Sequence, residues 1–340
     1  MGRLVLVVWS FAAAACGQHG AGAGDANHDG PTSDGPPTLS CSSLPSSCGP
    51  TGTSSCCASP LVPGGTFYRS FDHGTDNAYT DMTNPATLSD FRLDTYEVTI
   101  GRFRQFVNAG LGTQVSPPPT GAGARTLNGM ANQGGWDPSW NASLAADTTA
   151  LVTAVKCDVR YQSWTDTPGA NEALPMNCIS WYEAFAFCAS DGGFLPTEAE
   201  WNYTAAGGSE QRAYPWSNPA SPLTIDCSYA NYDINSPPGA YCANGTTGAV
   251  NRVGSESPKG DAKYGQADLA GNVSEWTLDA YQSPYGNPCN DCADLTFAGG
   301  RVVHGGGLGE GAPSLRGAFR YNASPFGGAA GVGVRCGRTP

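Results

Sequence analysis

Charged side chains and histidine are both scarce in this chain of 340 residues. Only 14% of the residues are charged, and the 17 Lys and Arg are outnumbered by 29 Asp and Glu, for a net charge of -12. No run of Lys or Arg occurs, which excludes binding to nucleic acid or to anionic membranes through electrostatics. The four histidines, His19, His28, His73 and His304, are too few to complete zinc sites for thirteen cysteines. Because these cysteines are dispersed, we interpret them as disulfides of an exported protein.

Glycine and proline, in contrast, are abundant. The chain has 46 Gly and 26 Pro, while its hydrophobic content of 40% is sufficient for a sizeable core. Gly and Pro interrupt regular elements, so this composition favours a loop-rich domain over a helical bundle.

The N-terminus resembles a lipoprotein signal peptide. An apolar run from Leu4 to Ala15 follows Arg3 and is too short to span a membrane. The segment Ala13-Ala14-Ala15-Cys16 resembles a lipobox, so we expect cleavage after residue 15 and lipidation of Cys16. Ordinary cleavage that leaves Cys16 free is the alternative. Lipidation leaves twelve cysteines, an even number, and predicts an outer-membrane or cell-surface lipoprotein; a periplasmic or secreted protein is the alternative location.

Three further segments follow the predicted signal peptide at residues 1–15. Residues 16–40 carry the lipidated Cys16 and a Gly/Asp/Pro-rich stretch that reads as a flexible linker. Residues 41–59 form a small segment with four cysteines, whose connectivity the sequence leaves open. Residues 60–338 run without a second linker and are expected to form one domain.

Within this domain, few segments have the pattern of a helix or a strand. Helices are expected to begin near Thr99, with Phe103 and Phe106 at helical spacing, in the segment that contains Trp181, and at Thr197, which forms a capping box with Glu200. Short β-like runs occur at residues 66–68, 302–303 and 331–334. We therefore expect an α+β fold of the loop-rich kind.

Six stretches, taken in order, resemble the formylglycine-generating enzyme (sulfatase-modifying factor) family. They are VPGGTF at 62–67, LDTYEVT at 93–99, the Ser180–Cys188 stretch with LPTEAEW at 195–201, YPW at 214–216, DLAGNVSEWT at 268–277 and GVRC at 333–336. The resemblance covers about residues 60–338. It implies the fold of that family, an elaborated C-type-lectin-like domain with little regular structure. We interpret LPTEAEW as scaffold, because Thr197 and Glu200 cap a helix and Trp201 packs inward.

The DLAGNVSEWT stretch is expected to bind a structural calcium ion. Asp268 and Glu275 lie seven residues apart in a Gly/Asn-rich turn, and hard cations bind carboxylate and carbonyl oxygens. The resemblance implies side-chain ligands from Asp268 and Glu275 and carbonyl ligands from Gly271 and Val273. A polar turn held by side-chain-to-backbone hydrogen bonds is the alternative.

Other metal sites have less support from the sequence. The resemblance implies a second calcium site at Asn231 and Tyr232, but its remaining ligands do not align clearly. His73 and His304 are the only histidines of the domain, and two isolated histidines cannot build a facial triad for iron. We therefore interpret each of them as an ordinary surface or core histidine.

The resemblance also sorts several of the cysteines. Cys188 and Cys336 match a family disulfide that joins the central helix to the last strand. A second family disulfide would need cysteines at Ala205 and Gly317, and both are absent, as expected if a bridge is lost as a unit.

The Cys289-x-x-Cys292 pair lies in a loop rich in Pro and Asn. It has the spacing of a redox motif, but no helix N-terminus is expected there to lower a thiol pKa. We interpret the pair as a local disulfide.

The copper ligands of active family members are missing. Those enzymes bind Cu(I) through two cysteines that follow an Arg-Gly-Gly-Ser signature, and soft thiolates are what Cu(I) requires. Here the arginine is His304, the serine is Gly307, and no cysteine occurs from residue 293 to 335. Copper is therefore not expected.

These patterns predict a non-catalytic binding or structural domain stabilised by calcium and held at the membrane by its lipid anchor alone. A groove lined by Trp276, Arg316 and Arg320 would bind an extended peptide or a glycan. The alternative is an oxidase that converts a sulfatase cysteine to formylglycine. A third option, an enzyme with repurposed residues such as Glu310, Arg316 and Arg320, lacks a paired base and nucleophile.

Overall fold

The computed structural model describes residues 39–42, 44–218, 223–234, 241–242, 250–296, 299–328 and 330–340. The chain divides into two compact units, Met1–Thr32 and Ser33–Pro340, and everything described here belongs to the second. The expected signal peptide and the lipidation site at Cys16 lie outside the described residues. Within the described ranges, no helix has both the length and the apolar character needed to cross a membrane.

Short elements separated by long loops make up this unit. The helices are α1 (Ile100–Asn108), α2 (Thr148–Ala154), α3 (Trp181–Ser190) and α4 (Glu198–Ala205). The strands are β1 (Leu61–Val62), β2 (Gly65–Tyr68), β3 (Pro85–Leu88), β4 (Phe91–Leu93), β5 (Arg125–Leu127), β6 (Met130–Gln133), β7 (Ser274–Ala280), β8 (Cys289–Asn290), β9 (Arg301–His304), β10 (Tyr321–Ala323), β11 (Val332–Gly333) and β12 (Gly337–Arg338). The predicted α+β, loop-rich fold is confirmed.

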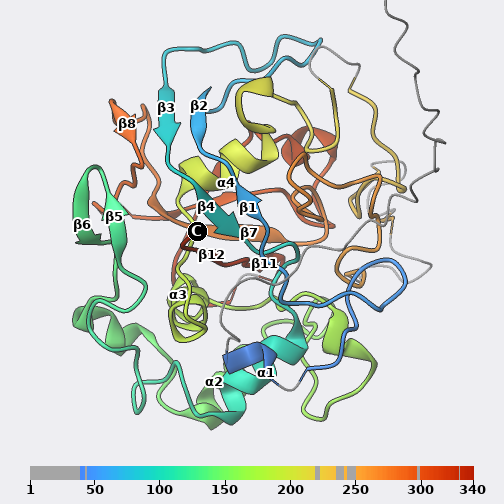
Figure 1. The fold of residues 1–340 in the computed structure, drawn as a ribbon. Coiled ribbons are helices and arrows are strands. Elements are labelled where there is room, and N and C mark those ends of the chain that lie inside the picture. The colour runs from blue at the N-terminus through green and yellow to red at the C-terminus, as the bar shows by residue number, and fades with distance from the viewer. Residues whose placement is uncertain are drawn as a thin grey trace, which may run out of the picture. The chain divides into compact units, whose positions relative to one another are not determined.

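Four small sheets bring distant parts of the chain together. Their strand orders are β1-β4-β12, β10-β9-β7-β11, β2-β3-β8 and β5-β6. In the second sheet β9 runs antiparallel to β7, with Glu275 opposite His304 and Ala280 opposite Arg301, and β11 runs parallel to β7. Figure 1 shows α3 and α4 on opposite sides of β7, and both helices pack on this strand. The β7 strand is thus the centre of the described domain.

Three of the helices begin where local capping chemistry predicts. The side chain of Thr99 accepts a hydrogen bond from the backbone N–H of Arg102 at the start of α1. Thr197 and Glu200 form both hydrogen bonds of the expected capping box at α4, and Ser180 forms a second capping box with Glu183 at α3. These caps satisfy N–H groups that have no partner within the helix.

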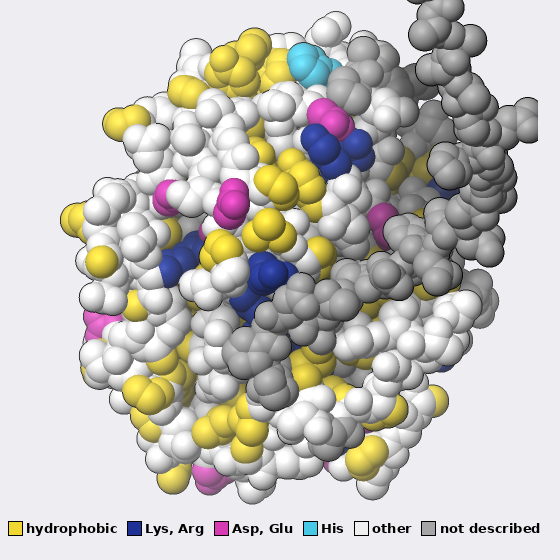
Figure 2. Space-filling view, in the orientation of Figure 1, with side chains coloured by type: hydrophobic (Ala, Val, Ile, Leu, Met, Phe, Trp, Pro, Cys, Tyr) yellow, Lys and Arg dark blue, Asp and Glu magenta, His cyan; other side chains and the backbone are white. Residues whose placement is uncertain are grey.

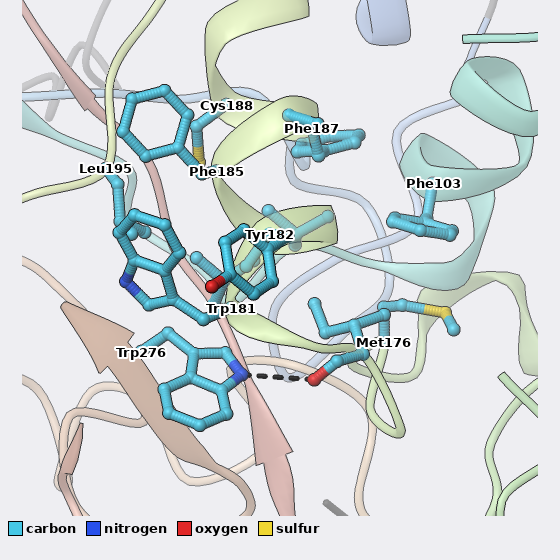
Figure 3. Close-up of a cluster of buried hydrophobic side chains, with 14 of the residues drawn as sticks. Phe103, Met176, Trp181, Tyr182, Phe185, Phe187, Cys188, Leu195 and Trp276 are labelled. Carbon is cyan, nitrogen blue, oxygen red and sulfur yellow. Dashed lines mark hydrogen bonds between the residues drawn. The ribbon is translucent and has the colours of Figure 1, made fainter. Parts of the chain in front are cut away.

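The largest hydrophobic cluster surrounds α3. Figure 3 shows how Trp181, Phe185 and Phe187 of this helix extend toward its neighbours, with Phe103 of α1 close by. The rings of Phe103 and Phe187 stack with centroids 5.7 Å apart. Trp276 of β7 belongs to the same cluster and donates a hydrogen bond from Nε1 to the carbonyl oxygen of Ile179 at 3.1 Å.

Six disulfides connect all twelve cysteines of the described residues. Cys188 of α3 is bonded to Cys336 next to β12, with 5.4 Å between the Cα atoms, as the family resemblance implied. Cys289 and Cys292 form the expected local bridge. The others are Cys41–Cys57, Cys48–Cys56, Cys157–Cys178 and Cys227–Cys242. Such a density of disulfides is typical of proteins that fold in an oxidising compartment.

Candidate cation and ligand sites

Three buried carboxylates, Glu97, Asp268 and Glu275, lie near one buried cation, Arg335. Glu275 and Arg335 are fully buried, and the Arg335 guanidinium donates to both Glu275 oxygens at 2.6–2.9 Å. Glu97 accepts hydrogen bonds from the backbone N–H of Val273 and from the side chain of Asn272. Among the described residues, Arg335 thus forms its ion pair with Glu275 alone, and Glu97 and Asp268 lie near that pair in a region of low dielectric constant.

Burial and the neighbouring charges shift the pKa values of the groups in this cluster. Burial, and then the charges of Asp268 and Glu275, raise the pKa of Glu97 well above its ordinary value. Burial, and then the charge of Glu256, raise the pKa of Asp268 well above its ordinary value. Burial opposes the charge of Arg335, but the neighbouring Glu275 carboxylate raises the pKa of this guanidinium. Both carboxylate shifts favour the neutral, protonated forms of Glu97 and Asp268.

The expected calcium ligands are only partly in place. The turn ends at Val273, and Glu275 lies on β7, where its Oε2 also accepts a hydrogen bond from the indole N–H of Trp201 at 2.7 Å. Glu275 thus has its oxygens occupied by protein donors, which corrects the expectation that it lies in the turn as a free carboxylate ligand. Asp268 accepts a hydrogen bond from the backbone N–H of Gly254 and forms no ion pair with any of the described residues. Among the described residues, no three His, Cys, Asp or Glu side chains converge as a metal site.

The second expected calcium site lies next to this cluster. Asn231 and Tyr232 are both buried, and the carbonyl oxygen of Asn231 accepts the backbone N–H of Asn272 at 2.7 Å. The segment expected to supply the remaining ligands falls partly on residues 243–249, outside the described residues. This site stays a prediction.

The three residues expected to line a ligand groove do not share one. Trp276 is fully buried in the core, because its place on β7 faces α3, so it cannot contact a ligand. Arg316 is buried and paired with Asp72 and Asp76, with Nε 2.9 Å from Asp72 Oδ2. Arg320 alone borders a cavity. These three residues therefore do not line a common groove, and Arg320 lies instead in the wall of a cavity elsewhere in the domain.

This cavity has a volume of about 390 Å³ and lies between the C-terminal end of β7, the β5–β6 hairpin and the loop around β8. In Figure 1, β8 and the β5–β6 hairpin lie at the same edge of the domain. Its charged lining residues are Arg69, Glu198, Asp279, Asp294 and Arg320.

Glu198 is at the centre of the hydrogen-bond network in the cavity wall. It is the first residue of α4 and accepts hydrogen bonds from the Tyr285 hydroxyl at 2.7 Å and from Arg320 Nη2 at 3.0 Å. Burial works against its ionisation, but the approach of His304 Nε2, at 3.6 Å, and the charge of Arg320 lower the pKa of Glu198. Glu198 is thus a charged partner for Arg320.

Asp279 lies beside this ion pair. Its two oxygens accept the backbone N–H groups of Glu198 and Asp294, each at 2.8 Å. Burial, and then the charge of Glu198, raise the pKa of Asp279 to about 7. Of the carboxylates in the lining, Glu198 thus favours the ionised form, while Asp279 titrates near neutral pH.

Apart from Arg320, the sequence did not identify the charged residues of this cavity. Glu198 stands in the LPTEAEW stretch, which we expected to be scaffold, and Asp279 and Tyr285 belong to no motif. The only signal was indirect: Glu198 and Asp279 are polar residues in otherwise buried elements, and buried carboxylates need partners.

Comparison with known proteins agrees with the fold. The model of the sulfatase-modifying factor enzyme 1-like domain matches residues 47–340. The chain belongs to this family. Relatives include inactive C-alpha-formylglycine-generating enzyme 2 of Bos taurus, 28% identical over 65% of this chain and 70% of that protein. The formylglycine-generating enzyme of Thermomonospora curvata is 29% identical over 66% of this chain and 72% of that protein. Relatives of both kinds, inactive and active, thus match at similar identity.

The fold of this family member also matches solved structures. PvdO from Pseudomonas aeruginosa superposes with a TM-score of 0.54 at 19% identity, covering 82% of this chain and 93% of that chain. Treponema denticola variable protein 1 gives 0.52 at 17% identity, covering 83% and 95%. At these identities the likeness extends to the fold alone.

Two glycines stand at positions that the family resemblance singled out, Gly317 at the missing disulfide and Gly307 at the signature serine. A Cβ atom on Gly317 would lie 3.1 Å from the Cβ of Ala205, so the two positions of the missing family disulfide are adjacent. Gly307, at the position of the signature serine, lies against the backbone of Ser274 and Gly331 and donates its N–H to Glu310.

The residues around Gly307 do not fit copper. Every cysteine of the described residues is bonded in a disulfide, so no thiolate is free near this segment. His304 is fully buried and stacks on Trp201 with centroids 4.6 Å apart, while His73 is exposed and packs edge-on against Phe71. A site of soft ligands for Cu(I) is therefore missing from the described part of the chain.

Proposed function

We propose that this family member is a non-catalytic binding module of the cell envelope. One observation carries the proposal: residues 293–335 contain no cysteine, and the twelve cysteines of the described residues are paired. The chemistry of the family's active members requires two thiolates for copper. A chain of this kind retains the fold and its cavities and can bind a peptide or a glycan without transforming it.

The test is incubation of the full chain with Cu(I), a thiol reductant and a peptide that contains Cys-x-Pro-x-Arg. Mass spectrometry then measures the mass loss that accompanies conversion of the cysteine to formylglycine. We expect no loss, with the formylglycine-generating enzyme of Thermomonospora curvata as the positive control. Copper-dependent conversion would establish the alternative, an oxidase, and overturn the proposal.

We further propose that calcium stabilises the turn after Asp268. The support is the charge count in the buried cluster, where Glu97, Asp268 and Glu275 lie near the single cation Arg335. Calcium would bind the carboxylate of Asp268 and backbone carbonyls such as those of Gly271 and Val273, with Glu275 left to Arg335. Removing calcium with a chelator should lower the melting temperature, and Asp268→Ala should remove that effect. A melting temperature that a chelator leaves unchanged would refute this role.

Attachment by a lipid on Cys16 is proposed from the sequence pattern at the N-terminus. Expression of the full chain in a bacterium fed radiolabelled palmitate tests it. We expect label in the protein and no label in Cys16→Ser. Label in both proteins, or in neither, would refute lipidation at this cysteine.

A further inference from the structure

Arg69 is a buried cation in the wall of the cavity that has no carboxylate partner among the described residues. Its residue surface is 4% exposed. Its guanidinium donates to three neutral acceptors, namely the carbonyl oxygen of Gly286 at 2.9 Å, Asn287 Oδ1 at 2.8 Å and the disulfide sulfur of Cys292 at 3.6 Å. A guanidinium has five N–H groups, and the Nε–H of Arg69 has no acceptor in the described part of the chain. The charges of Glu198 and Asp279 act on Arg69 only from beyond ion-pair distance, so this buried guanidinium has no charged group in direct contact among the described residues.

The second arginine of the cavity shows what Arg69 lacks. Arg320 is paired with Glu198, whereas Arg69 forms no ion pair within the described ranges. The two guanidiniums lie over the ring of Tyr285, at 4.4 Å for Arg69 and 4.2 Å for Arg320. The ring compensates part of the positive charge but supplies no acceptor for the remaining N–H groups. An anionic group that enters the cavity would complete the coordination of Arg69.

The rest of the lining indicates what else the ligand carries. Neutral polar side chains of Asn128, Gln133, Gln282 and Thr296 border the cavity, together with the carboxylate of Asp294. Amide groups both donate hydrogen bonds to hydroxyls and accept them, and a carboxylate accepts them, so a ligand with several hydroxyls matches such a lining. A peptide with an acidic side chain would use fewer of these groups.

We propose that this cavity binds an acidic sugar residue, a uronic acid, whose carboxylate pairs with Arg69 and whose hydroxyls bond to the neutral polar wall. The inference rests on the proposed function as a binding module and specifies its ligand class. Planar carboxylates match the fork of a guanidinium, and such charge-assisted bonds are stronger than neutral ones.

Most of this cavity lies away from the segment that corresponds to the copper site of active relatives, and the two approach each other where His304 lies 3.6 Å from Glu198. Ala280 and Asp279, at the C-terminal end of β7, border the cavity. Gly307 lies at the other end of the strand, next to Ser274. The proposed sugar site is thus independent of the chemistry that this chain lacks.

Calorimetric titration of the full chain with two matched probes tests the proposal. Methyl β-glucuronide and methyl β-glucoside differ only in the carboxylate, so we expect the glucuronide to bind at least about tenfold more tightly. Equal binding of both sugars, or no binding of the glucuronide, would overturn the proposal. Because both probes are titrated into the unchanged chain, the comparison tests the proposal even if substitutions at Arg69 impair folding.

Variants then locate the binding. Arg69→Gln should abolish the preference for the glucuronide, and Arg69→Lys should retain part of it. Arg160→Gln, which changes an exposed arginine outside the cavity, serves as the control and should leave the preference intact. A preference that survives Arg69→Gln, or a diglutamate peptide that binds more tightly than the glucuronide, would refute the assignment. Failure here leaves the formylglycine assay unaffected, so the two proposals fail separately.

Discussion

Replacing Glu275 by Gln separates two roles for this residue, a calcium ligand and the partner of Arg335. Gln has nearly the same shape, but it removes the negative charge and places an amide donor where an oxygen accepted from the guanidinium. Both side chains of the pair are fully buried, and three contacts of 2.6–2.9 Å join them. The variant therefore leaves Arg335 charged and without its partner in the interior.

The expected cost follows from this burial. Removing one member of a buried ion pair destabilises a protein by about 3–5 kcal/mol, because the other charge stays desolvated. Trp201 would also lose a charged acceptor for its indole N–H, a bond of 2.7 Å. We expect the same loss in the presence of calcium and of a chelator, since neither contact involves a metal ion.

Urea denaturation in calcium and in a chelator measures the two free energies. If Glu275 were a calcium ligand, the wild type in chelator and Glu275→Gln would have the same stability, and the variant would not respond to calcium. That result would refute our reasoning. The double variant Glu275→Met/Arg335→Met is the control, because an apolar pair of similar volume should restore most of the lost stability.

Three other predictions concern the scaffold and its pH dependence. Replacing Cys188 and Cys336 by Ala opens a bridge between residues 148 apart and should cost roughly 5 kcal/mol in urea denaturation; a loss under about 1 kcal/mol would contradict the loop-entropy argument. Thr197→Ala removes the cap of α4 and should lower the unfolding free energy by about 1 kcal/mol, and an unchanged value would show that the cap does not contribute. Burial, and then the charge of Glu198, raise the pKa of Asp279 from 3.8 to about 7, so the folded state keeps a proton that the unfolded state has released. Stability should therefore fall as pH rises from about 4 to 7, by up to about 1.4 kcal/mol per unit, and Asp279→Asn should flatten this slope when urea midpoints are compared across that range.

Local features of the fold could be predicted from the sequence. The start of α1 at Thr99 and the capping box of Thr197 and Glu200 depend on residues three or four positions apart, so a short stretch contains the whole interaction. The Cys188–Cys336 bridge joins residues far apart in the sequence, so residue spacing could not predict it. It was predicted from the family resemblance.

The β7 strand could not be predicted in the same way. Its seven residues are all buried, yet Glu275, Thr277 and Asp279 are polar. From Glu275 to Ala280 the residues alternate between polar and apolar, which is the pattern of a half-buried strand, but the Gly/Asn stretch that precedes them favoured a turn. The partners that make burial of these side chains tolerable, Arg335 and the backbone N–H of Glu198 among them, come from distant segments. For this reason the sequence placed Glu275 in a turn, whereas the structure places it on β7 beside Arg335.

The interpretation of the LPTEAEW stretch as scaffold alone is incomplete, because α4 also contributes to the cavity wall. Glu198 and Trp201 are three residues apart, so both lie on one face of the helix, and α4 packs on β7 and β9. Glu198 turns to the cavity and bonds with Tyr285, while Trp201 turns to the buried cluster and bonds with Glu275. His304 of β9 stacks on Trp201 and approaches Glu198, which places it between the two. One turn of helix therefore positions the wall of the proposed sugar site and the buried ion pair, and the stretch that looked like scaffold alone is a part of both.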